Sequence, residues 1–440
     1  MKIKIACFLF IVFFLLSCKE ARLSTGDIDY IKQKYSVEAI NYFYETAFHR
    51  DFVGFNENLI KWNQQDIKLF MEGELWEQDS VFVESALKQI NELELPPKLR
   101  LTKDKSQANQ ILYFGNYDYL AEKIIWQHSD KGLFVGGGTS NMSNKYKKDG
   151  VTVVANAAGR YTRHKTDSLQ IRQSVILEEI VQSLGIIGDA WSYSNSIFYE
   201  GYGDVLFLSE IDKEVLNLLY EKCIPPFYSR SYFEDDFQDV LYNINASEKI
   251  VGYVLEQDIP FEYLQYIKDN SFRDSILIKF PRDVFVSLSG DITDSDTDFV
   301  KNLIHTLSSE HLQLQYTPAG SKRKYSAAMI KISYKKKTGT TDSIDSEMLI
   351  EWHTMMFPYR VDGELSMVSD EFDRDRTINN AFLKVLGFDR QGNAVLSIAD
   401  EDSLQQEIVS LLYQPIFYSG MHEKQLDEAM EIVSAARNLK

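Results

Sequence analysis

Glu178, Glu179 and Gln182 form the most compact group of polar side chains in this sequence that could do chemistry. They fall within an apolar run, residues 175–186, whose hydrophobic positions recur at helical spacing and define one face of a helix. Glu178 and Gln182 are four residues apart, so they lie one turn apart on that helix. A carboxylate can bind a metal ion or act as a general base, whereas a neutral amide is a poor ligand for zinc. Gly185 is placed to end the helix.

The spacing of these four residues resembles the zincin helix, His-Glu-x-x-His-x-x-Gly. Glu178 and Gln182 stand where that helix has its two metal-binding histidines, and Glu179 stands where it has the base that activates the metal-bound water. Further along, residues 196–199 read Ser-Ile-Phe-Tyr, which is similar to the turn that lies under the metal in metzincin proteases.

The whole degenerate pattern resembles a bacterial family catalogued only as a domain of unknown function. The resemblance is closest over residues 150–225 and extends to 50–235. It implies a zincin-like frame in the first half of the chain, but it carries no known activity with it.

The resemblance also identifies which metal ligands would be missing. Zinc sites use about three protein ligands and a water, and imidazole is the usual nitrogen donor. Gly188 stands where a third histidine would fall, and Asp189 follows it. The remaining candidate ligands are therefore Glu178, Gln182 and Asp189, with Glu179 as the candidate base. We expect no bound zinc and no other cofactor apart from a covalent lipid.

Three interpretations of this segment remain open from the sequence. In the first and preferred one, Glu178, Glu179 and Gln182 form a solvated helix face or cap a local network. In the second, they line a pocket for a ligand or peptide without catalysis. In the third, the protein is a metal-dependent peptidase with an unusual oxygen-rich metal site. Whether the chain is an enzyme is thus undecided, and the first two alternatives favour a protein that is not.

The N-terminus predicts export. Two lysines precede a core of about 12 apolar residues, which is typical of a signal peptide and too short to span a bilayer. The core ends in Leu-Leu-Ser-Cys, with the cysteine at position 18, and this resembles the lipobox of bacterial lipoproteins. The resemblance implies cleavage after Ser17 and acylation of Cys18, with palmitate as the typical acyl chain. Lys19, by analogy with lipoprotein sorting, favours the outer membrane of the cell envelope.

Composition limits the partners that we expect. The formal net charge of -18 argues against nucleic acid as a partner, because that interaction requires a basic face. After export and acylation, Cys223 is the one cysteine left, so no internal disulfide can form, and we expect it to be a small buried side chain. The expected partners are the membrane, through the lipid, and an envelope protein or peptide.

Two halves of the chain can be laid on each other in order. Ile60-Lys61-Trp62 matches Ile278-Lys279-Phe280 at an offset of 218, and the strand-like segment 66–74 matches 283–291 at 217. Leu184-Gly185 then matches Leu386-Gly387 at 202, and Leu218-Leu219-Tyr220 matches Leu411-Leu412-Tyr413 at 193. The order never breaks, which predicts a duplication with shorter loops late in the second copy. Asn380, Ala381 and Lys384 replace Glu178, Glu179 and Gln182 there.

The elements around these residues predict an α+β fold with two tandem related domains. Each copy has strands, a helix ending before a break, more strands and further helices. The predicted boundaries are a signal peptide over 1–17, a lipid-anchored tether over 18–29, and an N-terminal helix over 30–49. Copy one then covers 50–235, a helical connection 236–269, and a diverged second copy 270–440. We expect the chain to be a lipid-anchored envelope protein with a non-catalytic binding or scaffolding role.

Overall fold

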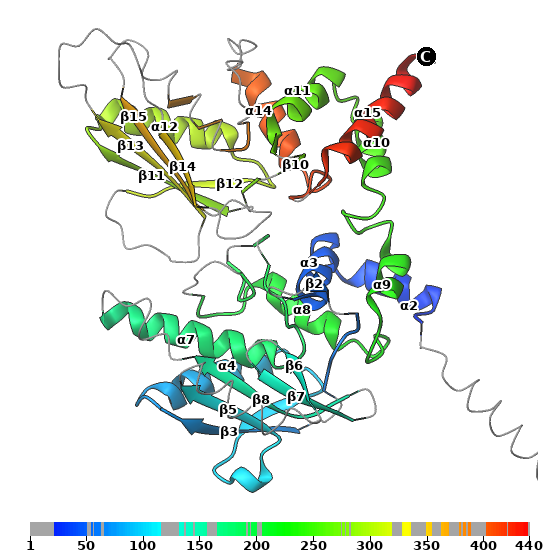
Figure 1. Ribbon diagram of the computed structural model, residues 1–440, viewed down its shortest axis with the longest axis vertical. Helices are drawn as coiled ribbons and strands as arrows, with labels where there is room; N and C mark the ends of the chain where they lie inside the picture. Colours follow the sequence, from blue (N-terminus) through cyan, green and yellow to red (C-terminus); the bar gives the residue numbers. More distant parts are fainter. Residues whose placement is uncertain are drawn as a thin grey trace, which may run out of the picture. The chain divides into compact units, whose positions relative to one another are not determined.

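The structure is a computed structural model that divides the chain into two compact units (Figure 1). Unit 1 contains the described residues up to Ser168, together with Val175–Gly188 and Glu210–Val240, and unit 2 contains Leu169–Ser174, Asp189–Ser209 and Leu241–Lys440. The structure describes residues 22–50, 54–55, 57–62, 66–115, 132–135, 138–143, 146–155, 165–190, 192–193, 195–199, 205–273, 275–277, 279–280, 283–318, 328–335, 349–353, 362–368, 378–379, 382–383, 386–388, 402–419 and 421–438.

Unit 1 contains a mixed sheet of six strands in the order β4-β3-β5-β8-β7-β6 (Figure 1). Four neighbouring strands run parallel, and they are β3 (Asp66–Gly73), β4 (Lys98–Leu101), β5 (Gln110–Gly115) and β8 (Tyr146–Ala155). Antiparallel strands β7 (Gly138–Ser143) and β6 (Gly132–Val135) complete one edge. Parallel neighbours require a crossover, and α4 (Asp79–Glu92) provides it between β3 and β4 by burying Val83, Ala86, Leu87 and Ile90.

Two helices precede this sheet. Helix α2 (Thr25–Lys34) begins at a capping box, in which Ser24 and Asp27 satisfy each other's backbone N–H groups. Helix α3 (Val37–Phe48) follows after Tyr35, whose extended backbone ends α2. The sequence predicts instead a tether over 18–29 and a single helix over 30–49. The polar composition of residues 22–29 hides the cap, and the burial of Ile31 and Tyr35 depends on distant segments of the chain.

The rest of unit 1 packs around α3. The short strands β1 (His49–Arg50) and β2 (Gly54–Phe55) pair after it, and α3 contacts α8 (Glu210–Leu219). Helix α9 (Arg230–Phe237) contributes Phe233, whose ring contacts those of Phe43 and Phe48 at 5.4 Å between centroids. These aromatic contacts fasten the N-terminal helices to a segment almost two hundred residues later in the chain.

Unit 2 contains a five-stranded sheet in the order β12-β11-β13-β15-β14. The parallel strands are β11 (Asp283–Gly290), β12 (Gln313–Tyr316), β13 (Ala328–Lys335) and β15 (Asp362–Val368), and β14 (Leu349–His353) is antiparallel at the edge. The helices are α10 (Ala246–Glu256), α11 (Phe261–Ser271), α12 (Asp294–Leu307), α14 (Asp402–Leu412) and α15 (Glu423–Asn438). Strands β9 (Phe272–Arg273) and β10 (Ile276–Leu277) form a short antiparallel pair.

The predicted helical connection over 236–269 lies in unit 2 from residue 241 onward and forms part of its core. Helices α10 and α11 both pack on α15, and Ile250, Val254, Leu264 and Ile267 are all fully buried in that core. From the sequence, these helices are predicted to be a connection between the two copies. Their apolar faces are covered by a helix that comes more than 150 residues later, which local sequence does not reveal.

The two sheets share one strand order. The order β4-β3-β5-β8-β7 in unit 1 corresponds to β12-β11-β13-β15-β14 in unit 2. In both orders the first four strands are parallel and the fifth is antiparallel, and unit 1 has β6 in addition. The mixture of helices and sheets confirms the predicted α+β class. The strand-like segments expected at 66–74 and 283–291 are present as β3 and β11, and the helical run at 175–186 coincides with the end of α7 (Lys165–Gln182). Among the residues that the structure describes, no helix is both long and apolar enough to cross a bilayer.

Candidate functional site

Helix α7 (Lys165–Gln182) carries the polar group that the sequence singles out. Its apolar positions Ile176 and Ile180 are completely buried, as is Leu184 just beyond the helix, while Glu178 and Glu179 are half-buried. Gln182 is only 7% exposed, so the solvated helix face of the preferred interpretation does not describe this residue. Each of these polar residues has an interaction partner, which favours the local network of the same interpretation.

The remaining candidates lie just beyond the helix. The backbone N–H of Gly188 donates to the carbonyl oxygen of Thr46 at 2.8 Å, so this position contributes a main-chain contact. Asp189 is half-buried and begins the segment Asp189–Ser209, which belongs to unit 2, whereas Glu178 and Gln182 belong to unit 1. In the described part of the chain, no three His, Cys, Asp or Glu residues come together as potential metal ligands.

The segment that resembles the metzincin turn is a compact buried turn. Ser196, Ile197, Phe198 and Tyr199 are each at most 5% exposed. The Ser196 hydroxyl accepts the N–H of Phe198 at 3.0 Å, and the Phe198 carbonyl accepts the N–H of Ala190 at 2.7 Å. These two hydrogen bonds hold the backbone of the turn in place, and both are made between groups of the protein itself.

The end of α7 is held in place by a set of buried hydrogen bonds. The indole N–H of Trp62 donates to the carbonyl oxygen of Ser183 at 2.9 Å, and the Tyr220 hydroxyl donates to that of Leu184 at 2.8 Å. The backbone N–H of Trp62 in turn donates to the Tyr220 hydroxyl at 3.4 Å. These bonds satisfy carbonyl groups that the helix itself leaves without partners.

Gly185 allows the backbone around Ile60 to pass close to the end of α7. Its φ of 128° is a conformation that side chains rarely allow, and a Cβ built there would lie 1.9 Å from the carbonyl oxygen of Ile60. The backbone of residues 59–62 therefore passes directly against the helix end. A glycine is required at this position by both the backbone angle and the available space.

Lys61 precedes Trp62 in the same buried segment and is 8% exposed. Its ammonium group donates to the carbonyl oxygens of Leu219 at 3.1 Å and Ile224 at 2.6 Å, at and just beyond the C-terminus of α8. Burial lowers the pKa of Lys61 to about 8. Helix C-termini attract positive charge, so this amine is well placed to satisfy the last carbonyls of the helix. We call Lys61, Trp62, Leu184, Leu219 and Tyr220 the Lys61–Tyr220 cluster.

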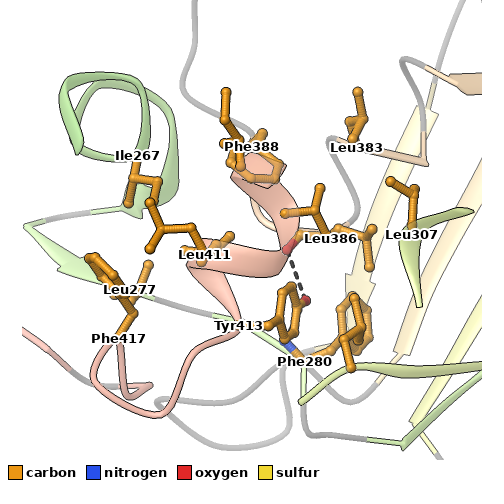
Figure 2. Close-up of a cluster of buried hydrophobic side chains, with 14 of the residues drawn as sticks. Ile267, Leu277, Phe280, Leu307, Leu383, Leu386, Phe388, Leu411, Tyr413 and Phe417 are labelled. Carbon is orange, nitrogen blue, oxygen red and sulfur yellow. Dashed lines mark hydrogen bonds between the residues drawn. The ribbon is translucent and has the colours of Figure 1, made fainter. Parts of the chain in front are cut away.

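Unit 2 contains a matching arrangement, the Lys279–Tyr413 cluster, consisting of Lys279, Phe280, Leu386, Leu412 and Tyr413; Figure 2 labels Phe280, Leu386 and Tyr413. The ammonium group of Lys279 donates to the carbonyl of Leu412 at 3.2 Å. The N–H of Phe280 donates to the Tyr413 hydroxyl at 3.4 Å, and that hydroxyl donates to the Leu386 carbonyl at 2.9 Å, the dashed line in Figure 2. Burial lowers the pKa of Lys279 to about 7.

The correspondence extends to the backbone around the two clusters. Gly387 has the same φ of 128° as Gly185. An isolated antiparallel bridge joins Asn58 to Ser229 in unit 1, and another joins Ile276 to His422 in unit 2. Every pair of corresponding residues is separated by one of the offsets found in the sequence, 218, 202 or 193.

Sequence reasoning did not identify the roles of Lys61, Lys279, Tyr220 and Tyr413. All four lie inside the matched segments, but a lysine and a tyrosine ordinarily suggest a surface. The available signal was the coincidence of a lysine and a tyrosine at equivalent places in both halves. Cys223 is half-buried, and burial raises the pKa of its thiol, so it has little thiolate character. Cys18 lies outside the described residues, as do Asn380, Ala381 and Lys384.

One family matches part of the chain. The sequence model of a family described as a protein of unknown function (DUF2927) matches residues 36–230, which lie almost entirely in the first half of the chain. The match supports the predicted relationship to an uncharacterised family. No curated protein matches the chain.

Proposed function

We propose that this chain is a lipid-anchored protein of the bacterial cell envelope with a non-catalytic binding or scaffolding role. In this proposal it consists of two copies of one α+β domain on a degenerate zincin-like frame. The observation that carries the proposal is the pairing of the Lys61–Tyr220 and Lys279–Tyr413 clusters. What recurs in both halves is a buried structural device, whereas the polar group on α7 occurs in the first half alone.

The duplication has support from independent kinds of evidence. The two sheets have a common strand order, and the two clusters share three hydrogen bonds: lysine ammonium to helix-end carbonyl, backbone N–H to tyrosine hydroxyl, and tyrosine hydroxyl to leucine carbonyl. The glycines at the two helix ends share a φ of 128°. In this proposal the copies keep the predicted boundaries of 50–235 and 270–440, and two helices precede the sheet in each unit, α2 and α3 in unit 1 and α10 and α11 in unit 2.

The donor set on α7 argues against a zinc enzyme. Of the three ligand positions in the zincin frame, one holds a carboxylate, Glu178, one a buried amide, Gln182, and one Gly188, which has no side chain. Zinc would need about three good donors at one point. A side chain such as Glu179 has no metal-bound water to activate unless such donors are present. We therefore assign the polar group of α7 a structural or ligand-binding role.

The lipid anchor rests on the sequence of the N-terminus. Acylation of Cys18 would hold the protein at the membrane, since more than one acyl chain makes an anchor durable. An exported protein tethered in this way and without a catalytic centre most simply binds another envelope protein or a peptide. The residue after the cysteine, Lys19, favours the outer membrane.

The anchor is tested by mass spectrometry of the mature N-terminus, with Cys18→Ala as the control. The proposal expects a chain that begins at residue 18 and carries a thioether-linked diacylglyceryl group. Cys18→Ala should remain an unprocessed precursor or be released from the membrane. An unmodified N-terminus beyond residue 18 would overturn the anchor.

A metal-dependent peptidase remains the second candidate, because Glu179 occupies the position of the zincin base. The two candidates differ in the response to Glu179→Gln. In a peptidase this change would abolish proteolysis without loss of the metal, since the base is not a ligand. In the proposed scaffold there is no proteolysis to abolish, and binding of the partner should persist.

A further inference from the structure

The first described residues of the chain are fastened firmly to unit 1. The guanidinium group of Arg22 pairs with Asp235 of α9 at 2.8 Å and lies 4.2 Å from the centre of the Tyr232 ring. Ten residues on, Lys32 pairs with Asp239 at 2.6 Å. Exposed ion pairs of this kind contribute little to stability. The burial of Leu23 and Ile31 therefore provides most of the attachment, and the ion pairs fix its position.

This attachment leaves very little chain between the body of unit 1 and the acylation site. Only three residues, 19–21, separate Cys18 from Arg22. Four residue steps reach at most about 14 Å, whatever conformation they adopt. If Cys18 carries the lipid, unit 1 is therefore held against the membrane with its α2 side nearest to it.

The outer surface of α2 and the start of α3 has side chains suited to that position. Tyr30 is 45% exposed and Val37 is 39% exposed, and both are large apolar groups on the part of unit 1 closest in sequence to the anchor. Between them in the sequence lies Lys34, whose ammonium group pairs with Glu221, donates to the Tyr30 hydroxyl at 3.0 Å and lies 5.3 Å from the centre of the Tyr30 ring. Tyrosine and lysine each combine an apolar body with a polar tip, which suits the boundary between lipid and water.

We infer that the surface formed by Tyr30, Lys34 and Val37, here called the α2 surface, rests on the phospholipid bilayer that holds the acyl chains of Cys18. This inference rests on the proposed lipid anchor. Asp29 is also exposed there, and the chain as a whole is acidic, so the α2 surface has little affinity for lipid by itself. A short tether raises its effective concentration at the membrane to the millimolar range, which makes a weak contact persistent.

The test uses the lipidated, full-length mature protein in phosphatidylcholine vesicles that contain a lipid with a nitroxide on its headgroup. A fluorophore is attached to Tyr30→Cys in a Cys223→Ser background. The matched control carries it on Val81→Cys, because Val81 is 62% exposed on α4, the helix that crosses between sheet strands in the same unit. Neither substitution removes a buried side chain, and circular dichroism verifies that both variants fold.

We expect strong quenching of the fluorophore at position 30 and several-fold weaker quenching at position 81. Equal quenching at both positions, in protein that floats with the vesicles, overturns the assignment of the α2 surface while leaving the anchor intact. Failure of the lipidated protein to float with the vesicles overturns the anchor, and this inference with it.

A second variant tests whether the short tether is responsible. Twenty Gly and Ser residues are inserted between Ala21 and Arg22, which gives the linker a root-mean-square length of about 27 Å. The longer linker should reduce quenching at position 30 towards the level at position 81, although the protein still floats. Unchanged quenching at position 30 contradicts the inference that the tether holds this surface at the bilayer.

Discussion

The hydroxyl of Tyr220 donates a hydrogen bond to the carbonyl oxygen of Leu184 at 2.8 Å, and so joins the end of α8 to the end of α7. Tyr413 does the same for Leu386 at 2.9 Å in unit 2. Each tyrosine also receives a backbone N–H, from Trp62 and from Phe280 respectively. A single hydroxyl therefore satisfies two buried backbone groups in each unit, which explains why an aromatic residue without a hydroxyl would not replace it.

Removing that hydroxyl should destabilise either unit. Tyr220→Phe leaves the Leu184 carbonyl and the Trp62 N–H buried without this partner, and an unsatisfied buried group costs about 1–3 kcal/mol. We expect the free energy of unfolding to fall by about that amount, measured by urea unfolding with intrinsic fluorescence. Tyr413→Phe should give a loss of similar size in unit 2. A change below about 0.5 kcal/mol in both variants would show that the clusters do not contribute as described.

Substitution of Gly185 gives a sharper test, because Gly252 offers a control position where a Cβ would meet no neighbouring atom. Gly185→Ala places a Cβ against the Ile60 carbonyl at a φ of 128°, so we expect a large loss of thermal stability or failure to fold. Gly252 lies inside α10, and a Cβ there meets nothing within 4 Å. Gly252→Ala should therefore be neutral or stabilise by up to about 1 kcal/mol, since alanine is the better helix former. Equal effects of the two substitutions would contradict the geometry at the end of α7.

Lys279 should make the stability of unit 2 depend on pH. Burial lowers its pKa to about 7 in the folded protein, from the ordinary value of 10.5 that it has in the unfolded chain. Between these values the unfolded chain binds more protons, so the free energy of unfolding rises with pH across that window. The penalty for burying the charged amine is present in full below pH 7 and relieved as the pH rises.

Lys279→Met isolates this contribution, because methionine has similar length and does not titrate. We expect wild type to gain stability relative to Lys279→Met between pH 7 and pH 10, by up to about 1.4 kcal/mol per pH unit. Urea unfolding at several pH values measures the difference. A difference that stays constant over this range would mean that the amine keeps its ordinary pKa in the folded protein.

The sequence predicted the strands β3 and β11 correctly, because the two segments match each other along their length. It also predicted the end of α7, whose apolar face repeats at helical spacing. The start of α2 was missed although Ser24 and Asp27 carry the signal of a capping box. A short polar stretch was interpreted as a tether, and the contacts that bury Ile31 come from distant parts of the chain.

The buried lysines show a different limit of sequence reasoning. Lys61 donates to a carbonyl 158 residues away, and Lys279 to one 133 residues away. No local pattern indicates that a helix end will meet a particular lysine after the chain has folded. The duplication supplied an indirect indication, since chance rarely keeps a lysine and a tyrosine at matched places in two halves.

The central claim, that α7 carries no zinc centre and the protein is a scaffold, is tested most directly by the zinc content of the purified full-length protein after dialysis. We predict far less than one zinc per chain, because Gln182 and Gly188 replace two of the ligands that a zincin site requires. A stoichiometric zinc ion, removed by a chelator together with proteolytic activity, would contradict the claim and establish the peptidase instead.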